Sequence, residues 1–292
     1  MTDRSVGTLA HGSARRWLVA VLILTLSHWS ASEAAAAAPA EAANSAAGAP
    51  AMTESQRDAR ELLDGMGEYL AGLKAFSMTI VAGYDAVQSN GQKIEFSERH
   101  KLTLDRPTRL RMEQVTSDGR HDLVLFDGRQ MTVLDGDTGA YAQAPQPDTV
   151  DDAIIYFVRD LKLRMPLAPL VLTHLPIELK HRFKNVDQVE TTDLLGVLTH
   201  HLAAQSSTVD LQVWVTDGPR ALPMRIVLTY KKEPGQPQFW ATFSSWNTHP
   251  KITNEMFEFH RPKNAHQVVF AVQVPSPTDE PPVPAVQGEI KP

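Results

Sequence analysis

Residues 101–115 read KLTLDRPTRLRMEQV, and two alternating runs stand on either side of an Arg–Pro pair. Leu102, Leu104, Leu110 and Met112 share one parity, and the positions between the members of each pair are charged or polar. Successive side chains of a strand point to opposite faces, so this stretch predicts two antiparallel strands with one apolar and one polar face. The Arg–Pro pair marks the turn between them.

The same alternation continues on both sides of this stretch. Upstream, alternating runs cover 76–84 and 94–104, and Gly-containing turns such as SNGQ, SDGR and GDTG separate the strands up to residue 145. Downstream, the expected strands are 186–194, 197–205, 209–215, 222–231 and 238–247, with MFEF at 256–259 closing the series. About eleven strands are therefore expected in an antiparallel meander.

The run LVLFDGRQMTVLD at 123–135 raises the question of whether Asp127 is an acid in a site. Asp127 and Gly128 stand between two apolar runs, and an Asp–Gly pair accepts positive φ angles in a two-residue hairpin. We therefore expect Asp127 to be a hairpin corner rather than a catalytic acid.

Helical spacing occurs at two places. Thr53 and Gln56 form a capping-box pattern before apolar residues that recur every three or four positions. At 148–176 apolar residues again have helical spacing, and prolines divide the later part of this segment into short helices. The expected fold is mainly β (α+β): a curved antiparallel half-barrel, with the N-terminal helix and a mid-chain helical lid on its concave face.

The two ends of the chain differ from the middle in composition. Residues 1–36 have two arginines before an apolar stretch and then small residues, which is typical of a cleaved signal peptide for general or twin-arginine export. The apolar stretch is shorter than the roughly twenty residues of a spanning helix, although an uncleaved anchor is the alternative. Residues 37–52 indicate an Ala/Pro-rich disordered linker and 273–292 a Pro-rich disordered tail. One folded domain is expected over 53–272, in the periplasm.

Composition and spacing exclude several kinds of site. The net charge of −6 argues against nucleic-acid binding, and the absence of cysteine excludes disulfides, a lipid-modified cysteine and thiolate chemistry. His200 and His201 are neighbours in an expected strand, so they point to opposite faces and cannot share a metal ion. No G-x-S-x-G motif or glycine-rich phosphate loop occurs. We expect no catalytic residue, no metal and no cofactor.

Two features each allow two interpretations. Trp214, Trp240 and Trp246 share parity with polar residues, so they indicate either a patch for a partner or cross-strand aromatic packing on the polar face. The short apolar helices either form a movable lid over a hydrophobic cavity or complete a static core.

The order of the motifs resembles that of the periplasmic outer-membrane lipoprotein carriers, which have the LolA-like fold. RP at 106–107 precedes apolar residues three and five positions after the proline, then SDG at 117–119, a hairpin, and FEFHRP at 257–262. The stretches LQVWVTDGPRALPMRIVLTYK and FSSWNTHPKI are also similar to exported proteins of unknown function near that superfamily.

This resemblance implies an incomplete barrel that binds acyl chains without covalent chemistry. In the carriers the arginine of the RP pair holds the lid through hydrogen bonds, so Arg106 is the expected lid latch. The alternative is that Arg106 is a surface arginine before a turn-forming proline. Leu110 and Met112 stand where the family has Phe and Trp, which puts lipoprotein as the cargo in doubt. The one-sided strands, the helical spacing and the motif order together give the expected cavity lining: Met78, Ile80, Phe96, Leu102, Leu104, Leu110, Met112, Ile154, Phe157, Val158 and Leu161.

The expected function is non-enzymatic binding of a lipid, an acylated protein or another hydrophobic ligand, as a carrier or chaperone in envelope biogenesis. At most peripheral membrane contact and no nucleic acid are expected. One alternative is an envelope scaffold that binds a protein partner through the Trp-bearing face. A less favoured alternative is a hydrolase, which would need a serine or carboxylate and a histidine in one pocket.

Overall fold

The computed structural model describes residues 52–145, 148–161 and 165–270. Helix α1 (Glu54–Gly72) opens this part, and its expected capping box is confirmed. The Gln56 backbone N–H donates to Thr53 Oγ1 at 3.2 Å, while the Thr53 N–H donates to Gln56 Oε1 at 3.1 Å. Two of the otherwise unpaired N–H groups at the helix start are therefore satisfied.

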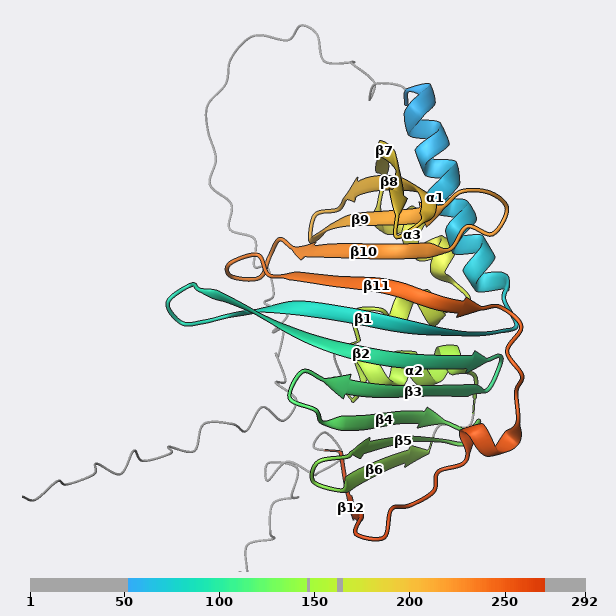
Figure 1. Cartoon of the computed structure of the whole chain (residues 1–292), viewed down its shortest axis with the longest axis vertical. Coiled ribbons are helices and arrows are strands. Elements are labelled where there is room, and N and C mark those ends of the chain that lie inside the picture. The colour runs from blue at the N-terminus through green and yellow to red at the C-terminus, as the bar shows by residue number, and fades with distance from the viewer. Residues whose placement is uncertain (1–51, 146–147, 162–164, 271–292) are drawn as a thin grey trace, which may run out of the picture. The chain divides into compact units, whose positions relative to one another are not determined.

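Twelve strands form one open, curved sheet in the described residues (Figure 1). They are β1 (Ala75–Val87), β2 (Lys93–Asp105), β3 (Arg109–Thr116), β4 (His121–Phe126), β5 (Gln130–Asp135), β6 (Ala140–Pro145), β7 (Asn185–Leu194), β8 (Val197–Gln205), β9 (Val209–Thr216), β10 (Pro223–Tyr230), β11 (Gln238–Asn247) and β12 (His266–Val268). The predicted mainly β class with a curved antiparallel sheet is confirmed.

The sheet order is β12-β6-β5-β4-β3-β2-β1-β11-β10-β9-β8-β7. Every neighbouring pair is antiparallel except β12 and β6, which are parallel. β1 pairs with both β2 and β11, so the first strand joins the half formed before the helical segment to the half formed after it.

Helices cover one face of the sheet, which Figure 1 shows behind the strands. The mid-chain segment contains α2 (Val150–Arg159), the 3₁₀ helix η1 (Ala168–Val171) and α3 (Leu175–Arg182). A proline lies in the first turn of both η1 and α3, which accounts for the division into short pieces. The buried faces of α1 and α2 join the inner side chains of the strands in one hydrophobic core.

The 101–115 stretch turns as its pattern predicts. Leu102 pairs with Met112 and Leu104 with Leu110 across β2 and β3, and these side chains lie on the helix-covered face. The odd-numbered residues of both strands point to the outer face.

The prediction that MFEF closes the sheet as a strand is wrong. Asn254–Phe257 forms the 3₁₀ helix η2, and residues 254–265 cross the outer face of the sheet as a segment that we call the C-terminal strap. Arg111 Nη1 donates to the Met256 carbonyl at 3.1 Å, and the Phe257 side chain is buried beneath the Arg109 guanidinium. The alternating Phe257 and Phe259 therefore belong to a segment that packs on the sheet, not to a strand within it. The short β12 that follows them has no alternation of apolar residues.

Asp127 is a hairpin corner, as predicted. Its carboxylate accepts from the backbone N–H groups of Arg129 at 2.8 Å and Gln130 at 2.9 Å. Gly128 has a φ of 92°, but Asp127 does not have a positive φ, so that part of the prediction is wrong. Asp127 stabilises the turn from its first position through its side chain.

The predicted signal peptide (1–36) and tail (273–292), and all of the predicted linker (37–52) except Met52, lie outside the described residues. Among the described helices, none is long and apolar enough to cross a membrane.

Candidate functional site

Most of the predicted lining residues meet on the concave face. Met78, Ile80, Leu102, Leu104, Leu110, Ile154, Phe157 and Leu161 are buried in one cluster, and the partly buried Met112 packs against it. Phe96 and Val158 lie apart, with exposed fractions of 38% and 39%. Phe96 stacks instead on Tyr84 at the far end of the β1–β2 hairpin, with 6.0 Å between ring centroids. Sheet and helix side chains thus pack directly against one another beneath α2.

Arg106 joins the β2–β3 turn to two helical elements. Its Nη2 donates to the Val171 carbonyl of η1 at 2.8 Å. Its Nη1 donates to the carbonyls of Leu70, at 3.2 Å, and Leu73, both at the end of α1. Burial lowers the pKa of Arg106, and the negative charge of Asp151 opposes that shift. The side chain therefore satisfies carbonyls at two helix ends from a partly buried position.

A second group of contacts holds the start of α2. The Val150 N–H donates to the Pro107 carbonyl at 2.7 Å, next to Arg106 in the chain. Asp151 accepts from the backbone N–H of Thr173 at 2.9 Å and lies 3.5 Å from His174 Nδ1. These contacts tie the start of α2 to the junction between η1 and α3 and to the β2–β3 turn.

A polar cluster of Glu98, Gln114 and the buried His100 interrupts the apolar face of β2 and β3, and the sequence patterns did not single it out. His100 Nε2 lies 2.9 Å from Glu98 Oε1, and Gln114 Nε2 donates to Glu98 Oε2 at 2.8 Å. His100 is 7% exposed, and its Nδ1 is buried without a hydrogen-bond partner in the described residues. The available signal was that Glu98 and His100 share the parity of the apolar residues Phe96, Leu102 and Leu104.

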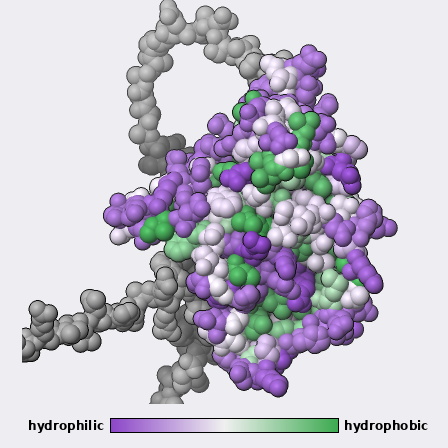
Figure 2. Space-filling view, viewed as in Figure 1, coloured by the Kyte–Doolittle hydropathy of each residue, from purple (hydrophilic) through white to green (hydrophobic). Residues whose placement is uncertain are grey.

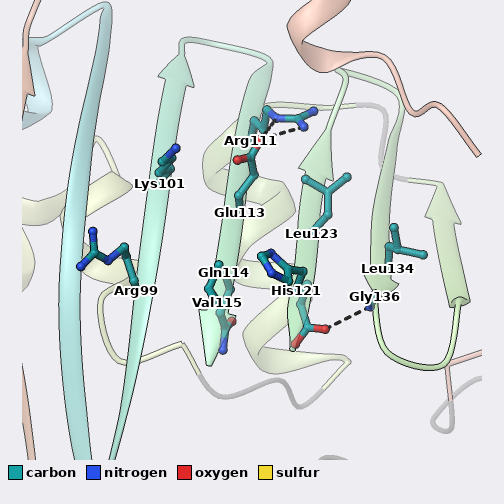
Figure 3. Close-up of a pocket in the computed structure, with 11 residues that line it drawn as sticks. Arg99, Lys101, Arg111, Glu113, Gln114, Val115, His121, Leu123, Leu134 and Gly136 are labelled. Carbon is teal, nitrogen blue, oxygen red and sulfur yellow. Dashed lines mark hydrogen bonds and ion pairs between the residues drawn. The ribbon is translucent and has the colours of Figure 1, made fainter. Parts of the chain in front are cut away.

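The outer face carries a hollow of about 390 Å³ over β2–β5. Figure 3 shows Arg99, Lys101 and Arg111 on one side of it and Leu123 and Leu134 on the other. Figure 2 shows that hydrophilic residues surround smaller hydrophobic areas on this face. The hollow lies on the opposite side of the strands from the predicted lining residues.

Two of the three tryptophans lie on the outer face, where each has partners within the sheet. Trp214 stacks on His201 with 3.9 Å between centroids, and Arg225 lies over both Trp214 and Trp240. Trp240 Nε1 donates to Glu95 at 3.1 Å. Cross-strand packing therefore explains both rings.

The prediction that Trp246 shares this face is wrong. Its ring packs against Phe76 and Phe243 of the core, at 5.6 and 6.0 Å. Ser245 has a φ of 54°, and the β1–β11 register shifts between Ser77 and Thr79. This bulge reverses the side-chain parity after Ser244.

The described histidines do not form a metal site. His200 and His201 point to opposite faces, as predicted: His200 bonds Asp217 at 2.8 Å, and His201 bonds Gln212 at 3.1 Å. Within the described ranges no group of three His, Cys, Asp or Glu residues could hold a metal ion.

Comparison with known proteins gives one family match. The model of the family described as "Predicted periplasmic protein (DUF2092)" matches residues 59–271. No curated protein matches the sequence.

Several solved structures are similar at low identity. LprF from Mycobacterium bovis is 14% identical with a TM-score of 0.43, covering 73% of this chain and 100% of LprF. A chain of the Pseudomonas aeruginosa MucA/MucB complex is 16% identical with a TM-score of 0.38, covering 70% of this chain and 61% of that one. A LolA superfamily protein from Nitrosomonas europaea is 11% identical with a TM-score of 0.34, covering 69% of this chain and 97% of that one.

Proposed function

Because the chain belongs to the DUF2092 family of predicted periplasmic proteins, we propose that it acts in the periplasm after cleavage of residues 1–36. There it binds a lipid, an acyl chain or another hydrophobic ligand between the concave face of the sheet and the helices. Binding is non-covalent and needs no catalytic residue or cofactor. The ligand is a free lipid or the acyl chain of a modified protein, received from or passed to an envelope partner.

The observation that carries this proposal is the way in which the helical segment is attached. Its apolar residues complete the core, but within the described ranges only two hydrogen bonds join it to the β2–β3 turn: Arg106 Nη2 donates to the Val171 carbonyl, and the Val150 N–H donates to the Pro107 carbonyl. Short helices with few polar ties separate from a sheet at lower cost than strands that share a ladder. The packed lining residues would then face an inserted acyl chain.

Arg106 is the latch of this lid. Its guanidinium binds η1 and the end of α1 together, so it holds the lid in the packed state. The motif order around Arg106, which resembles that of the LolA-like carriers, supports the same role.

Titration with the neutral fluorescent probe N-phenyl-1-naphthylamine tests the proposal. The wild-type protein should bind the probe with increased fluorescence. Arg106→Leu should raise the apparent affinity about tenfold or more, because loss of the hydrogen bonds populates the open, binding-competent state. The matched control is Arg220→Leu, which removes an exposed arginine from the β9–β10 loop and should leave the affinity unchanged.

Two results would count against these assignments. Absence of probe binding to the wild-type protein would contradict the hydrophobic site. Binding that Arg106→Leu leaves unchanged or weakens would remove Arg106 as the latch of the packed state.

A further inference from the structure

The polar cluster of Glu98, His100 and Gln114 lies on the face that the proposed ligand would contact. His100 pairs with Ile80 of β1 and Gln114 of β3, so it stands in a cross-strand row of the concave face. Leu102 is two residues further along β2, which places it about 7 Å away on the same face. The apolar lining thus ends at a polar group within the length of a short acyl chain.

The hydrogen-bonding state of His100 depends on its partner. Glu98 accepts from Gln114 through one carboxylate oxygen and lies 2.9 Å from His100 Nε2 through the other. When the imidazole is neutral, its hydrogen lies on Nε2, facing a carboxylate that can only accept, and Nδ1 is then an acceptor. A buried acceptor without a donor is unfavourable, and few such groups occur in folded proteins.

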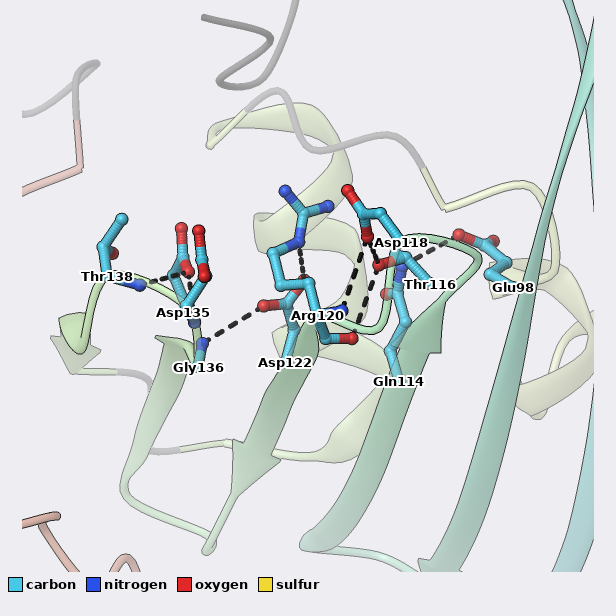
Figure 4. Close-up of polar contacts among 10 residues, drawn as sticks. Glu98, Gln114, Thr116, Asp118, Arg120, Asp122, Asp135, Gly136 and Thr138 are labelled. Atoms are coloured by element: carbon cyan, nitrogen blue, oxygen red, sulfur yellow. Dashed lines mark hydrogen bonds and ion pairs between the residues drawn. The ribbon is translucent and has the colours of Figure 1, made fainter. Parts of the chain in front are cut away.

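The neighbouring Asp122 and Gln114 already have partners. Figure 4 shows Asp122, which pairs with Arg120 at 3.1 Å and accepts from the Gly136 N–H at 3.3 Å. The figure also shows the bond between Gln114 and Glu98. Among the described atoms of Glu98, His100 and Gln114, His100 Nδ1 is therefore the buried polar atom without a hydrogen-bond partner, and it is free to contact a ligand.

We propose that His100 Nδ1 accepts a hydrogen bond from a hydroxyl or amide group at the polar end of the hydrophobic ligand. This inference rests on the proposed function and narrows its ligand class to neutral lipids with a donor group, such as monoacylglycerols. A carboxylate has no hydrogen to donate and would be repelled by Glu98, so ionised fatty acids bind more weakly.

Calorimetric titration of the full chain with 1-decanoylglycerol and methyl decanoate tests this inference. The two molecules share an acyl chain, but only the first carries hydroxyl groups. The wild-type protein should bind 1-decanoylglycerol about tenfold more tightly, the effect of one buried hydrogen bond and of an acceptor otherwise left unpaired. His100→Phe should remove this preference, and His121→Phe, which changes an exposed histidine of the outer face, should keep it.

Nitrogen NMR of the wild-type imidazole gives a second measurement that does not depend on the folding of a variant. The Nδ1 resonance of His100 should move on addition of 1-decanoylglycerol and not on addition of methyl decanoate. Equal affinity for the two molecules, or a stationary Nδ1 resonance, would overturn the role of His100 while leaving the hydrophobic site intact. Failure of both molecules to bind the wild-type protein would overturn the proposed function as well.

Discussion

Arg106 shows how one side chain can connect elements that are distant in the sequence. It reaches the carbonyls of Leu70, Leu73 and Val171 from a turn between two strands. A lysine could not bind this set in the same way, because its single ammonium lacks the planar, forked donors of a guanidinium. The chemistry of the turn therefore depends on arginine and not only on positive charge.

The surroundings of Gly83 and Gly65 predict that replacing each of them with alanine changes the stability of the protein in opposite directions. A Cβ at Gly83 would lie 2.6 Å from the Trp240 ring, whereas nothing lies within 4 Å of a Cβ at Gly65 in α1. Gly83→Ala should lower the free energy of unfolding by about 1–3 kcal/mol through overpacking. The control Gly65→Ala should raise it by up to about 1 kcal/mol, because alanine favours helix. Urea denaturation measures both changes, and equal shifts would contradict the close contact between Gly83 and Trp240.

Asp122 predicts a pH dependence. Burial, as the main cause, raises its pKa, and Asp135 adds to the shift. Just above the ordinary aspartate pKa of about 3.9, the folded state binds more protons than the unfolded state, so the contribution of Asp122 to stability falls as the pH rises. Asp122→Asn should become progressively more stable relative to the wild type across this range.

Asp118 provides a control of opposite sign. Its hydrogen bond from the Thr116 side chain lowers its pKa, so its contribution is present above the ordinary aspartate pKa and is lost as the pH falls. Asp118→Asn should therefore become less stable relative to the wild type as the pH rises. Urea denaturation over a pH series measures both variants, and slopes of the same sign would contradict the assigned causes.

At the scale of elements, the 101–115 hairpin contacts the helices on one face of the sheet and the C-terminal strap on the other. Leu102 and Leu104 pack beneath the helices, while Arg109 and Arg111 hold the C-terminal strap on the other face. The β2–β3 hairpin is thus the part of the sheet to which both the helical segment and the C-terminal strap are attached.

The strap predicts the cost of losing one buried ring. Phe257 is 2% exposed, whereas Phe259 is only partly buried and packs on Tyr141 with 5.1 Å between centroids. Phe257→Ala should lower the free energy of unfolding by about 3–5 kcal/mol, and Phe259→Ala should cost less. Chemical denaturation monitored by circular dichroism tests this order. A loss below about 1 kcal/mol for Phe257→Ala would show that the strap is not part of the cooperative fold.

The strands were largely predictable because their side chains alternate between a buried face and a solvent-exposed face. Parity correctly placed Leu102, Leu110 and most of the other predicted lining residues on the helix-covered face. It failed at Trp246, because the bulge at Ser245 depends on pairing with β1. It also passed over His100, whose burial depends on what covers the strand.

The hydrogen bonds from Arg106 to the helices could be expected only from the resemblance around that residue. Its acceptors at Leu70 in α1 and Val171 in η1 are 36 and 65 residues away in the sequence, so no local pattern identifies them. Helical spacing predicted α2 but could not distinguish a movable lid from a static core. The two alternatives differ in whether a ligand enters beneath the helices.

At the scale of the whole molecule, the sheet is a continuous support and the helices are additions to one side. The long pairing of β1 with β2 and β11 holds the two halves together, independently of α2 and η1. Separation of the helical segment would therefore leave the ladder of strands intact. This division fits a protein whose concave face receives a hydrophobic molecule.

The most direct test is native mass spectrometry of the protein purified from the periplasm, followed by lipid extraction and identification. We expect a species heavier than the mature chain, whose excess mass corresponds to one acyl-chain lipid. We expect Ile80→Glu, which places a carboxylate among the lining residues, to lose that species while remaining folded by circular dichroism. Wild-type protein that carries no lipid and takes up none when mixed with envelope lipid extract would contradict the binding of a hydrophobic ligand.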